Sequence, residues 1–360
     1  MTILLCIRRS VLGIVLGVAC AVAPLLPAFG APQTISTIEP GSTSDAWVAW
    51  DKLSCTYKPA AKHPDKWVAV LRKPARPMRL GFGEQGEGQV LLDAFNASMK
   101  AVTAKVGIEL IIGNYNLPST TDAVTQAQAI ALRGPSVVVS FNVLTAVMQA
   151  VNGNYSRGCV PIIQVTAPAP NTIVFGASNT DVGKTEGNYL AAYVKQHNWQ
   201  PATVTVLGLQ SPGLGESIGL RIGDCQRAVQ AALPGVKVDN LASVSPSTAD
   251  AQTKTTDWLT AHPNDHHVLV CSIADLFSIG AANAFKGANR SDDGVVMGAG
   301  GGADATTTIK AGGPMVGTVD FGWGRYGDYL VPLAEDVFEG KPVPTEIHQQ
   351  LRVLDKSNIS

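Results

Sequence analysis

The sequence predicts an α/β protein made of two Rossmann-like lobes with parallel sheets. From Met78 onward, about ten apolar runs of strand length alternate with segments whose apolar residues recur at helical spacing. The runs are apolar on both faces, which is typical of parallel strands covered by helices on two sides. About ten strands are too many for one common doubly wound sheet and suit two sheets of about five or six.

The chain begins like a secretory signal peptide. Two arginines precede the apolar run SVLGIVLGVACAVAPLLPAF, and small residues frame a cleavage site before Ala31. We therefore predict residues 1–30 as a signal peptide and a periplasmic location for the mature protein. Two alternatives stay open: a retained membrane anchor, although two prolines interrupt the run, and lipidation at Cys20.

Residues 31–77 do not follow the strand and helix alternation, and we predict a Trp-rich N-terminal extension there. The segment holds Trp47, Trp50 and Trp67, half of the six tryptophans in the chain. One interpretation is a small appendage whose aromatic rings pack on the first lobe. The other is a surface that docks a partner protein.

The body of the chain can be followed run by run. The predicted strands are MRLGFG, IELIIG, SVVVSF, VPIIQVT, TIVFGAS, TVTVLGL, VKVDNLA, HVLVCSI, GVVMGAG and MVGTVDF. The predicted helices include VLLDAFNASMKAVTAKVG, TDAVTQAQAIALRG, VGKTEGNYLAAYVKQH and AQTKTTDWLTAH. Gly107, Gly134 and Gly287 stand where helices are expected to end, because glycine readily takes the left-handed conformation there.

Four cysteines remain after the predicted signal peptide: Cys55, Cys159, Cys225 and Cys271. Export would place them in an oxidising compartment. Cys271 lies in an apolar run and Cys225 in a helical pattern, so both are expected to be buried free thiols. If a disulfide forms, we favour Cys55 with Cys159, and the other pairings stay open.

The stretch MRLGFGEQGEG contains a dinucleotide-binding pattern, since Gly81, Gly83 and Gly86 fit G-x-G-x-x-G. A nucleotide site would also need an acid after the second strand, but IELIIGNYN ends in a glycine, an asparagine and a tyrosine. We therefore predict no cofactor. The net charge of −1 gives no basic stripe for nucleic acid, so a small ligand or a protein partner is expected.

Three passages carry a resemblance to a known family: AQAIALRGPSVVVSFN, GCVPIIQVT, and GASNTDVGKTEGNYLAAYV with its Asn-x-x-x-Gly turn. In these, the chain resembles the periplasmic substrate-binding proteins of ABC transporters, in the ribose/galactose-binding class. The resemblance covers about residues 78–351. It implies the type I periplasmic-binding-protein fold, in which lobes joined by a three-crossover hinge close on a ligand and dock on a membrane permease.

The resemblance also implies lobe boundaries and a monomer. We place lobe one at residues 78–178 plus 322–347. Lobe two takes residues 179–321 plus 348–360.

The implied ligand-binding residues lie in the loops after the strands. They are Glu84, Gln85, Gln89, Phe141, Asn142, Thr166, Arg221, Asp275, Phe321 and Trp323. Several have simpler interpretations. Arg221 could only pair with Asp224 or Glu216, Asp275 could only cap a helix, Phe321 and Trp323 could only pack the hinge, and Gln89 could only be a surface residue.

The charged sugar clamp of the family is replaced in this chain. Thr166 and Ala167 stand where the family has an Asp-Arg pair, Ala274 precedes Asp275 where an Asn-Asp pair is expected, and Gly300 replaces an aspartate. Charged partners make the strongest hydrogen bonds to sugar hydroxyls. The ligand is therefore expected to be a sugar derivative, a cyclitol or a flatter organic molecule rather than an ordinary free sugar.

The predicted function is to bind a small polar ligand, sugar or sugar-like, and to deliver it to an ABC importer, without catalysis. A sensory binding protein for a chemoreceptor or sensor kinase is the alternative. A serine hydrolase is disfavoured: GESIG matches G-x-S-x-G around Ser217, but QSPGL separates it from the preceding strand. His262, His266 and His267 are expected to be structural or exposed, and no metal is predicted.

Overall fold

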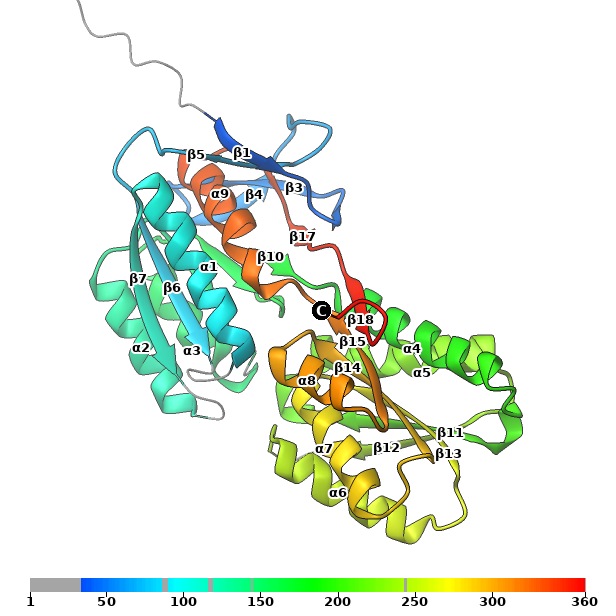
Figure 1. Ribbon diagram of the computed structural model, residues 1–360. Helices are drawn as coiled ribbons and strands as arrows, with labels where there is room; N and C mark the ends of the chain where they lie inside the picture. The colour runs from blue at the N-terminus through cyan, green and yellow to red at the C-terminus, as the bar shows by residue number, and fades with distance from the viewer. Residues whose placement is uncertain (1–33, 86–89, 116–118, 144, 243–244, 360) are drawn as a thin grey trace, which may run out of the picture.

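The runs predicted as strands all form strands in the computed structural model, and they divide between the sheets of two lobes (Figure 1). The structure describes residues 34–85, 90–115, 119–143, 145–242 and 245–359. The predicted signal peptide lies outside these residues. The predicted α/β class, with two lobes and mainly parallel sheets, is confirmed.

Lobe one is built on a sheet with the strand order β2, β17, β10, β9, β8, β6, β7. Neighbouring strands are parallel except β2, which runs antiparallel to β17. The strands are β2 (Ser42–Thr43), β6 (Arg79–Gln85), β7 (Glu109–Tyr115), β8 (Val137–Ser140), β9 (Ile162–Val165), β10 (Ile173–Gly176) and β17 (Glu346–His348).

Helices cover both faces of this sheet. They are α1 (Val90–Val106), α2 (Thr120–Leu132), α3 (Thr145–Ser156) and α9 (Tyr326–Glu339), with α1 packed on α9 and α2 packed on α3. Successive side chains of β8 pack alternately against the helices on the two faces of the sheet. Val137 and Val139 join the core cluster that contains Phe95 of α1, whereas Val138 joins the cluster that contains Ile130 of α2. Burial on both sides explains why the run is apolar at every position.

Lobe two has the strand order β12, β11, β13, β14, β15, β18, and only β18 is antiparallel to its neighbour. The strands are β11 (Val204–Gln210), β12 (Lys237–Ala242), β13 (His267–Ser272), β14 (Gly294–Gly300), β15 (Met315–Asp320) and β18 (Arg352–Asp355). The helices are α4 (Asn179–Gln196), α5 (Glu216–Ala232), α6 (Thr248–Ala261), α7 (Asp275–Gly287) and α8 (Ala303–Ala311). α4 packs on α5, and α6 packs on α7.

Short 3-10 helices and the helix ends complete these lobes. The 3-10 helices are η1 (Pro201–Thr203), η2 (Pro212–Leu214) and η3 (Trp323–Arg325). Gly107 and Gly134 take the predicted left-handed conformation, with φ of 74° and 63°. α7 ends at Gly287 as predicted, but the left-handed residue that follows it is Asn289. Within the described ranges, none of the helices has both the length and the apolar character that a bilayer crossing requires.

Within the described chain, the backbone passes between the lobes after β10, after β15 and after β17. The last passage is short, because β17 pairs with β10 in lobe one and β18 pairs with β15 in lobe two. These passages form the predicted three-crossover hinge.

The N-terminal extension is hydrogen-bonded into lobe one. β1 (Thr34–Ile38) pairs with β5 (Ala69–Arg72), and β3 (Trp47–Asp51) lies between β4 (Thr56–Pro59) and β16 (Val343–Pro344). The indole rings of this segment are buried, with exposed fractions of 7%, 8% and 3% for Trp47, Trp50 and Trp67. The aromatic residues therefore pack in the protein's own core, as the appendage interpretation requires.

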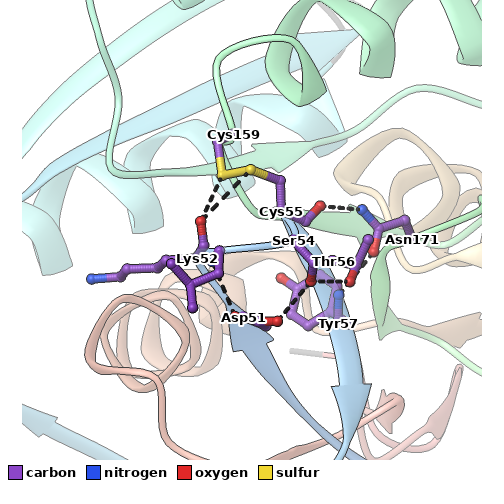
Figure 2. The surroundings of a disulfide bond; sticks show 9 residues. Asp51, Lys52, Ser54, Cys55, Thr56, Tyr57, Cys159 and Asn171 are labelled. Atoms are coloured by element: carbon purple, nitrogen blue, oxygen red, sulfur yellow. Dashed lines mark hydrogen bonds between the residues drawn. A yellow bond between two sulfur atoms is a disulfide. The ribbon is translucent and has the colours of Figure 1, made fainter.

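A disulfide between Cys55 and Cys159 fastens this extension to lobe one, which confirms the favoured pairing. Figure 2 shows Asn171 beside it, reaching the start of β4. The Asn171 side chain donates to the carbonyl oxygen of Cys55 at 3.1 Å and accepts from the Tyr57 amide at 2.9 Å. The covalent bond and the two hydrogen bonds hold the β3–β4 hairpin against lobe one.

The prediction of free thiols at Cys225 and Cys271 is wrong, because these residues form a second disulfide. Both side chains are fully buried, as expected. α5 packs on β13, which brings the Cα atoms of the two cysteines to 6.1 Å. The burial followed from the local pattern, but the pairing depends on which helix covers which strand.

Carboxyl groups of α9 surround Arg72 at the end of β5. Arg72 lies 2.9 Å from Glu335 and 2.7 Å from Asp336, while Trp67 donates to Asp336 at 3.2 Å. Glu339 and Lys341 complete the cluster. The Glu335 side chain has no exposed surface, and its burial raises its pKa from the ordinary 4.5 to about 7.

We expect Glu335→Gln to change the pH dependence of stability. The folded protein holds the Glu335 proton more tightly than the unfolded chain, so the wild type loses stability as the pH rises from about 4.5 through about 7. Glutamine cannot ionise. Chemical denaturation should therefore show the variant gaining stability relative to the wild type between pH 5 and pH 8, and parallel pH profiles would contradict this assignment.

Candidate functional site

A cavity of about 110 Å³ lies between the lobes, at the carboxyl ends of the strands. This is where open α/β sheets place their ligands. Residues after β8 and β9 of lobe one line it, together with the end of β14 and residues after β13 and β15 of lobe two. The lining consists of Leu92, Phe141, Val143, Thr166, Leu214, Ile218, Arg221, Pro246, Ile273, Ala274, Leu276, Phe277, Ala299, Gly300, Phe321 and Trp323.

Aromatic rings form one wall of the cavity. The ring centroids of Phe141 and Trp323 are 5.6 Å apart, and those of Phe321 and Trp323 are 5.7 Å apart. Phe95 and Tyr326 support the Trp323 ring from behind, at 5.9 Å and 4.8 Å. The rings predicted at Phe141, Phe321 and Trp323 therefore come together at one place.

Arg221 is the charged residue of the lining. Its Nε donates to Asn179 Oδ1 at 2.8 Å, its Nη1 donates to the carbonyl oxygen of Ile273 at 2.6 Å, and its guanidinium lies 4.8 Å from the centre of the Phe321 ring. Desolvation lowers its pKa to about 10, so it stays protonated at neutral pH. The simpler interpretation was that Arg221 only pairs with a neighbouring acid such as Asp224. The structure does not show this pair, because Asp224 pairs with Arg227 instead.

Asn179, which the sequence analysis did not select, links the two sides of the site. Its Nδ2 lies 3.3 Å from the carbonyl oxygen of Thr166 and 3.0 Å from Ser217 Oγ. Its Oδ1 accepts from Arg221. This asparagine is the first residue of the Asn-x-x-x-Gly turn that carried the family resemblance, so that motif was the signal for it.

Glu186 is a second residue that the sequence analysis missed. It is fully buried on α4 and accepts a hydrogen bond from the Ser272 amide at 3.3 Å. Burial raises its pKa well above the ordinary value, and the nearby Arg221 opposes that shift. Its carboxyl group also approaches the sulfurs of Cys225 and Cys271, but those sulfurs are bonded to each other.

Asp275 lies behind the cavity wall rather than in the lining. Its carboxylate accepts from Thr318 Oγ1 at 2.6 Å and from the Gly302 amide at 2.9 Å. Burial raises its pKa to about 6. These bonds fix the loop between β14 and α8, so Asp275 shapes the cavity without facing it, and the helix-capping interpretation also fails because no side chain caps α7.

The replaced clamp positions do lie at the cavity. Thr166, Ala274 and Gly300 all belong to the lining, whereas Ala167 is buried outside it. Thr166 has a φ of 71°, and its hydroxyl is buried without a hydrogen-bond partner among the described residues. At three positions where the resemblance implied charged or amide side chains, this cavity has a threonine, an alanine and a glycine.

The other predicted residues lie elsewhere. Glu84 and Asn142 are buried at the ends of β6 and β8 but are not part of the lining. Gln85 is the last residue of β6. Gln89 lies outside the described residues, as does the third glycine of the dinucleotide pattern, Gly86.

The other two glycines of that pattern make room for a helix. They lie within β6, and a Cβ on Gly81 would come within 2.8 Å of Ile130 Cγ2 and 2.9 Å of Val138 Cγ2. A Cβ on Gly83 would lie 3.3 Å from the Tyr155 hydroxyl oxygen and 3.7 Å from Ile130 Cδ1. The pattern therefore allows α2 to approach the sheet closely, rather than a backbone to approach a phosphate.

The hydrolase pattern and the histidines also have structural surroundings. Ser217 lies in the first turn of α5 after η2, and not at a direct turn from a strand into a helix. His262 stacks on Trp258 at 4.3 Å, His266 lies 3.1 Å from Asp293, and His267 stacks on Trp199 at 4.2 Å.

Comparisons with solved structures show the same fold. An ABC transporter solute-binding protein from Mycobacterium smegmatis with bound glycerol is 22% identical, with a TM-score of 0.66, over 79% of this chain and 96% of that chain. One from Actinobacillus succinogenes with bound D-allose is 18% identical, with a TM-score of 0.66, over 78% and 98%. One from Agrobacterium vitis with α-D-tagatopyranose is 16% identical, with a TM-score of 0.69, over 79% and 96%.

A comparison with curated protein sequences finds no significant match. The family model described as a periplasmic binding protein domain matches residues 87–342, which is more than half of the chain. The matched range contains strands of both sheets, two of the three passages between the lobes and the whole cavity lining given above. The chain therefore belongs to the periplasmic binding protein family.

Proposed function

We propose that this protein is an exported solute-binding protein that closes its two lobes on a small polar ligand, sugar or sugar-like, and delivers it to an ABC importer. One observation carries the proposal: a single cavity receives residues from both lobes, with the buried cation Arg221 at its wall. A ligand that contacts both lobes stabilises the closed form. The similar structures with bound glycerol, D-allose and α-D-tagatopyranose support a ligand of this size.

The proposal includes a periplasmic location, a monomer in solution and an inner-membrane permease as partner. The two disulfides support an oxidising compartment. The sensory alternative loses its main argument, because the indole rings of the N-terminal extension are buried and cannot dock a receptor in this conformation.

Thermal denaturation tests the binding function. The chain without residues 1–30, freed of bound solute by unfolding and refolding, is screened against sugars, sugar acids, cyclitols and small organic acids. We expect one class to raise the melting temperature, because a ligand that binds only the folded state stabilises it. Small-angle X-ray scattering with the same compound should show a decrease in the radius of gyration.

Arg221→Met is expected to weaken binding of that compound by about 10-fold to 100-fold, the usual cost of a lost hydrogen bond to a charged group. Arg227→Met is the matched control. It removes an arginine from the same helix whose side chain is 63% exposed. Equal affinities of the two variants would contradict the proposed site.

A further inference from the structure

The polar groups of the cavity are hydrogen-bond donors. Arg221 uses Nε and Nη1 in its bonds to the protein, which leaves Nη2 for a ligand. The Trp323 ring lines the cavity, and its indole N–H is buried without a partner among the described residues. The Thr166 hydroxyl is also buried and unpaired there, and it can donate.

Apart from the Thr166 hydroxyl, which can also accept, side-chain acceptors are missing from the described part of the same surface. Among the described residues, the lining contains no aspartate, glutamate, asparagine or glutamine. The carbonyl oxygen of Ile273 already accepts from Arg221, and the carboxylate of Asp275 is held by Thr318 and Gly302. A free sugar has several hydroxyl hydrogens to donate, and each one buried without an acceptor weakens binding.

The charge of the cavity also favours a ligand that accepts hydrogen bonds. Arg221 brings a positive charge to the wall, while the nearest carboxyl groups, Glu186 and Asp275, are fully buried behind it. Burial raises the pKa of Glu186 well above its ordinary value, which favours its neutral form. Asp275 is ionised at neutral pH, because its pKa is raised only to about 6, but its charge is held by bonds from Thr318 and Gly302. An anion in the cavity would therefore meet a cation at the wall, with the protein's own carboxyl groups behind it.

The remainder of the surface is apolar. Leu92, Phe141, Phe277 and Phe321 face the cavity together with the Trp323 ring. A ligand body with many hydroxyl groups would lose its water shell against these side chains without gaining hydrogen bonds.

We infer that the ligand is a small monocarboxylate, whose carboxylate accepts hydrogen bonds from Arg221 and the neighbouring donors and whose ring-shaped or chain-shaped body lies against the aromatic wall. A carboxylate has acceptors only, which suits a surface whose polar side chains are Arg221 and Trp323, which only donate, and Thr166, which can donate. The inference rests on the proposed solute-binding function and assigns its ligand to the small organic acids rather than to the sugars.

The test compares each acid with its own amide, which has nearly the same shape but no charge. Calorimetry at pH 7.5 measures the affinity of the chain without residues 1–30 for two pairs: benzoate with benzamide, and cyclohexanecarboxylate with its amide. Glucose, ribose and glycerol are measured in the same way as neutral polyols. We expect the acids to bind at least about 10-fold more tightly than their amides and than the three neutral polyols. Arg221→Met should remove the difference between acid and amide, whereas Arg227→Met should keep it.

Two further variants keep the test valid if Arg221→Met does not fold. Thr166→Val removes one donor at nearly constant volume, and Trp323→Phe removes the indole N–H together with one ring. Each should weaken the acid more than the amide. Tight binding of a neutral polyol without binding of the acids overturns the monocarboxylate inference and leaves the proposed function intact. No binding of any of these compounds counts against both.

Discussion

Replacing Cys55 and Cys159 together by alanine is expected to lower the free energy of unfolding by about 2–5 kcal/mol. The two cysteines are 104 residues apart, so the disulfide closes a long loop and restricts the unfolded chain strongly. It also holds the β3–β4 hairpin, whose exposed turn would otherwise be fastened only by hydrogen bonds such as those of Asn171. Denaturant unfolding of the wild type and the double variant measures the difference.

Reducing agent provides the control for this experiment. The wild type loses the disulfide between Cys55 and Cys159 on reduction. Its denaturation midpoint should therefore move toward the midpoint of the double variant, in which Cys225 and Cys271 are unchanged. Hydrogen exchange should locate the earliest loss of protection in β3 and β4. A variant as stable as the oxidised wild type would show that the strand pairing alone holds the extension.

The second large effect is expected at the contact between α4 and α5. A Cβ on Gly187 would collide with the Cys225 carbonyl oxygen and come within 2.7 Å of Ala228 Cβ. Backbone cannot move aside as a flexible side chain can, so Gly187→Ala should destabilise the fold by about 1–3 kcal/mol. Gly219→Ala is the matched control. Gly219 lies on α5 of the same helix pair, and a Cβ there would meet no atom within 4 Å. This substitution should therefore be neutral or stabilise the fold by up to about 1 kcal/mol.

The same contact connects packing to the candidate site. A Cβ on Gly183 would meet the carbonyl oxygen of Arg221 and lie 2.9 Å from Asp224 Cβ. Gly183→Ala should therefore push the start of α5 away from α4 and weaken the bond between Arg221 and Asn179. If Gly183→Ala and Gly187→Ala were both as stable as the wild type, the helices would not be packed as closely as the structure shows.

The sequence was sufficient for the central strands because their signal is local. A run such as SVVVSF is apolar at each position, and a strand covered on both faces requires that. The extension gave no such signal. β2 pairs with β17 across about 300 residues of chain, and a pairing over that distance depends on the finished lobe rather than on local pattern.

The part of the site that lies directly after strands could be predicted from the sequence. Phe141, Thr166, Phe321 and Trp323 follow strands and line the cavity as predicted, although their role in ligand binding stays a proposal. Glu186 was missed because a glutamate on a helix is usually exposed. Its position between two glycines that face α5 was the available signal, since helix residues three and four apart share a face. The lobe boundaries also stay a prediction.

The first and last strands of the described chain lie on different lobes, which has a practical consequence. β1, at the start of the described chain, is paired with β5 beside lobe one, whereas β18 adds the last strand to the sheet of lobe two. Figure 1 shows these two strands on opposite sides of the hinge. A donor dye near β1 and an acceptor dye after β18 would therefore sit on different lobes. Resonance energy transfer between them would follow the proposed closure directly, with no label inside the cavity.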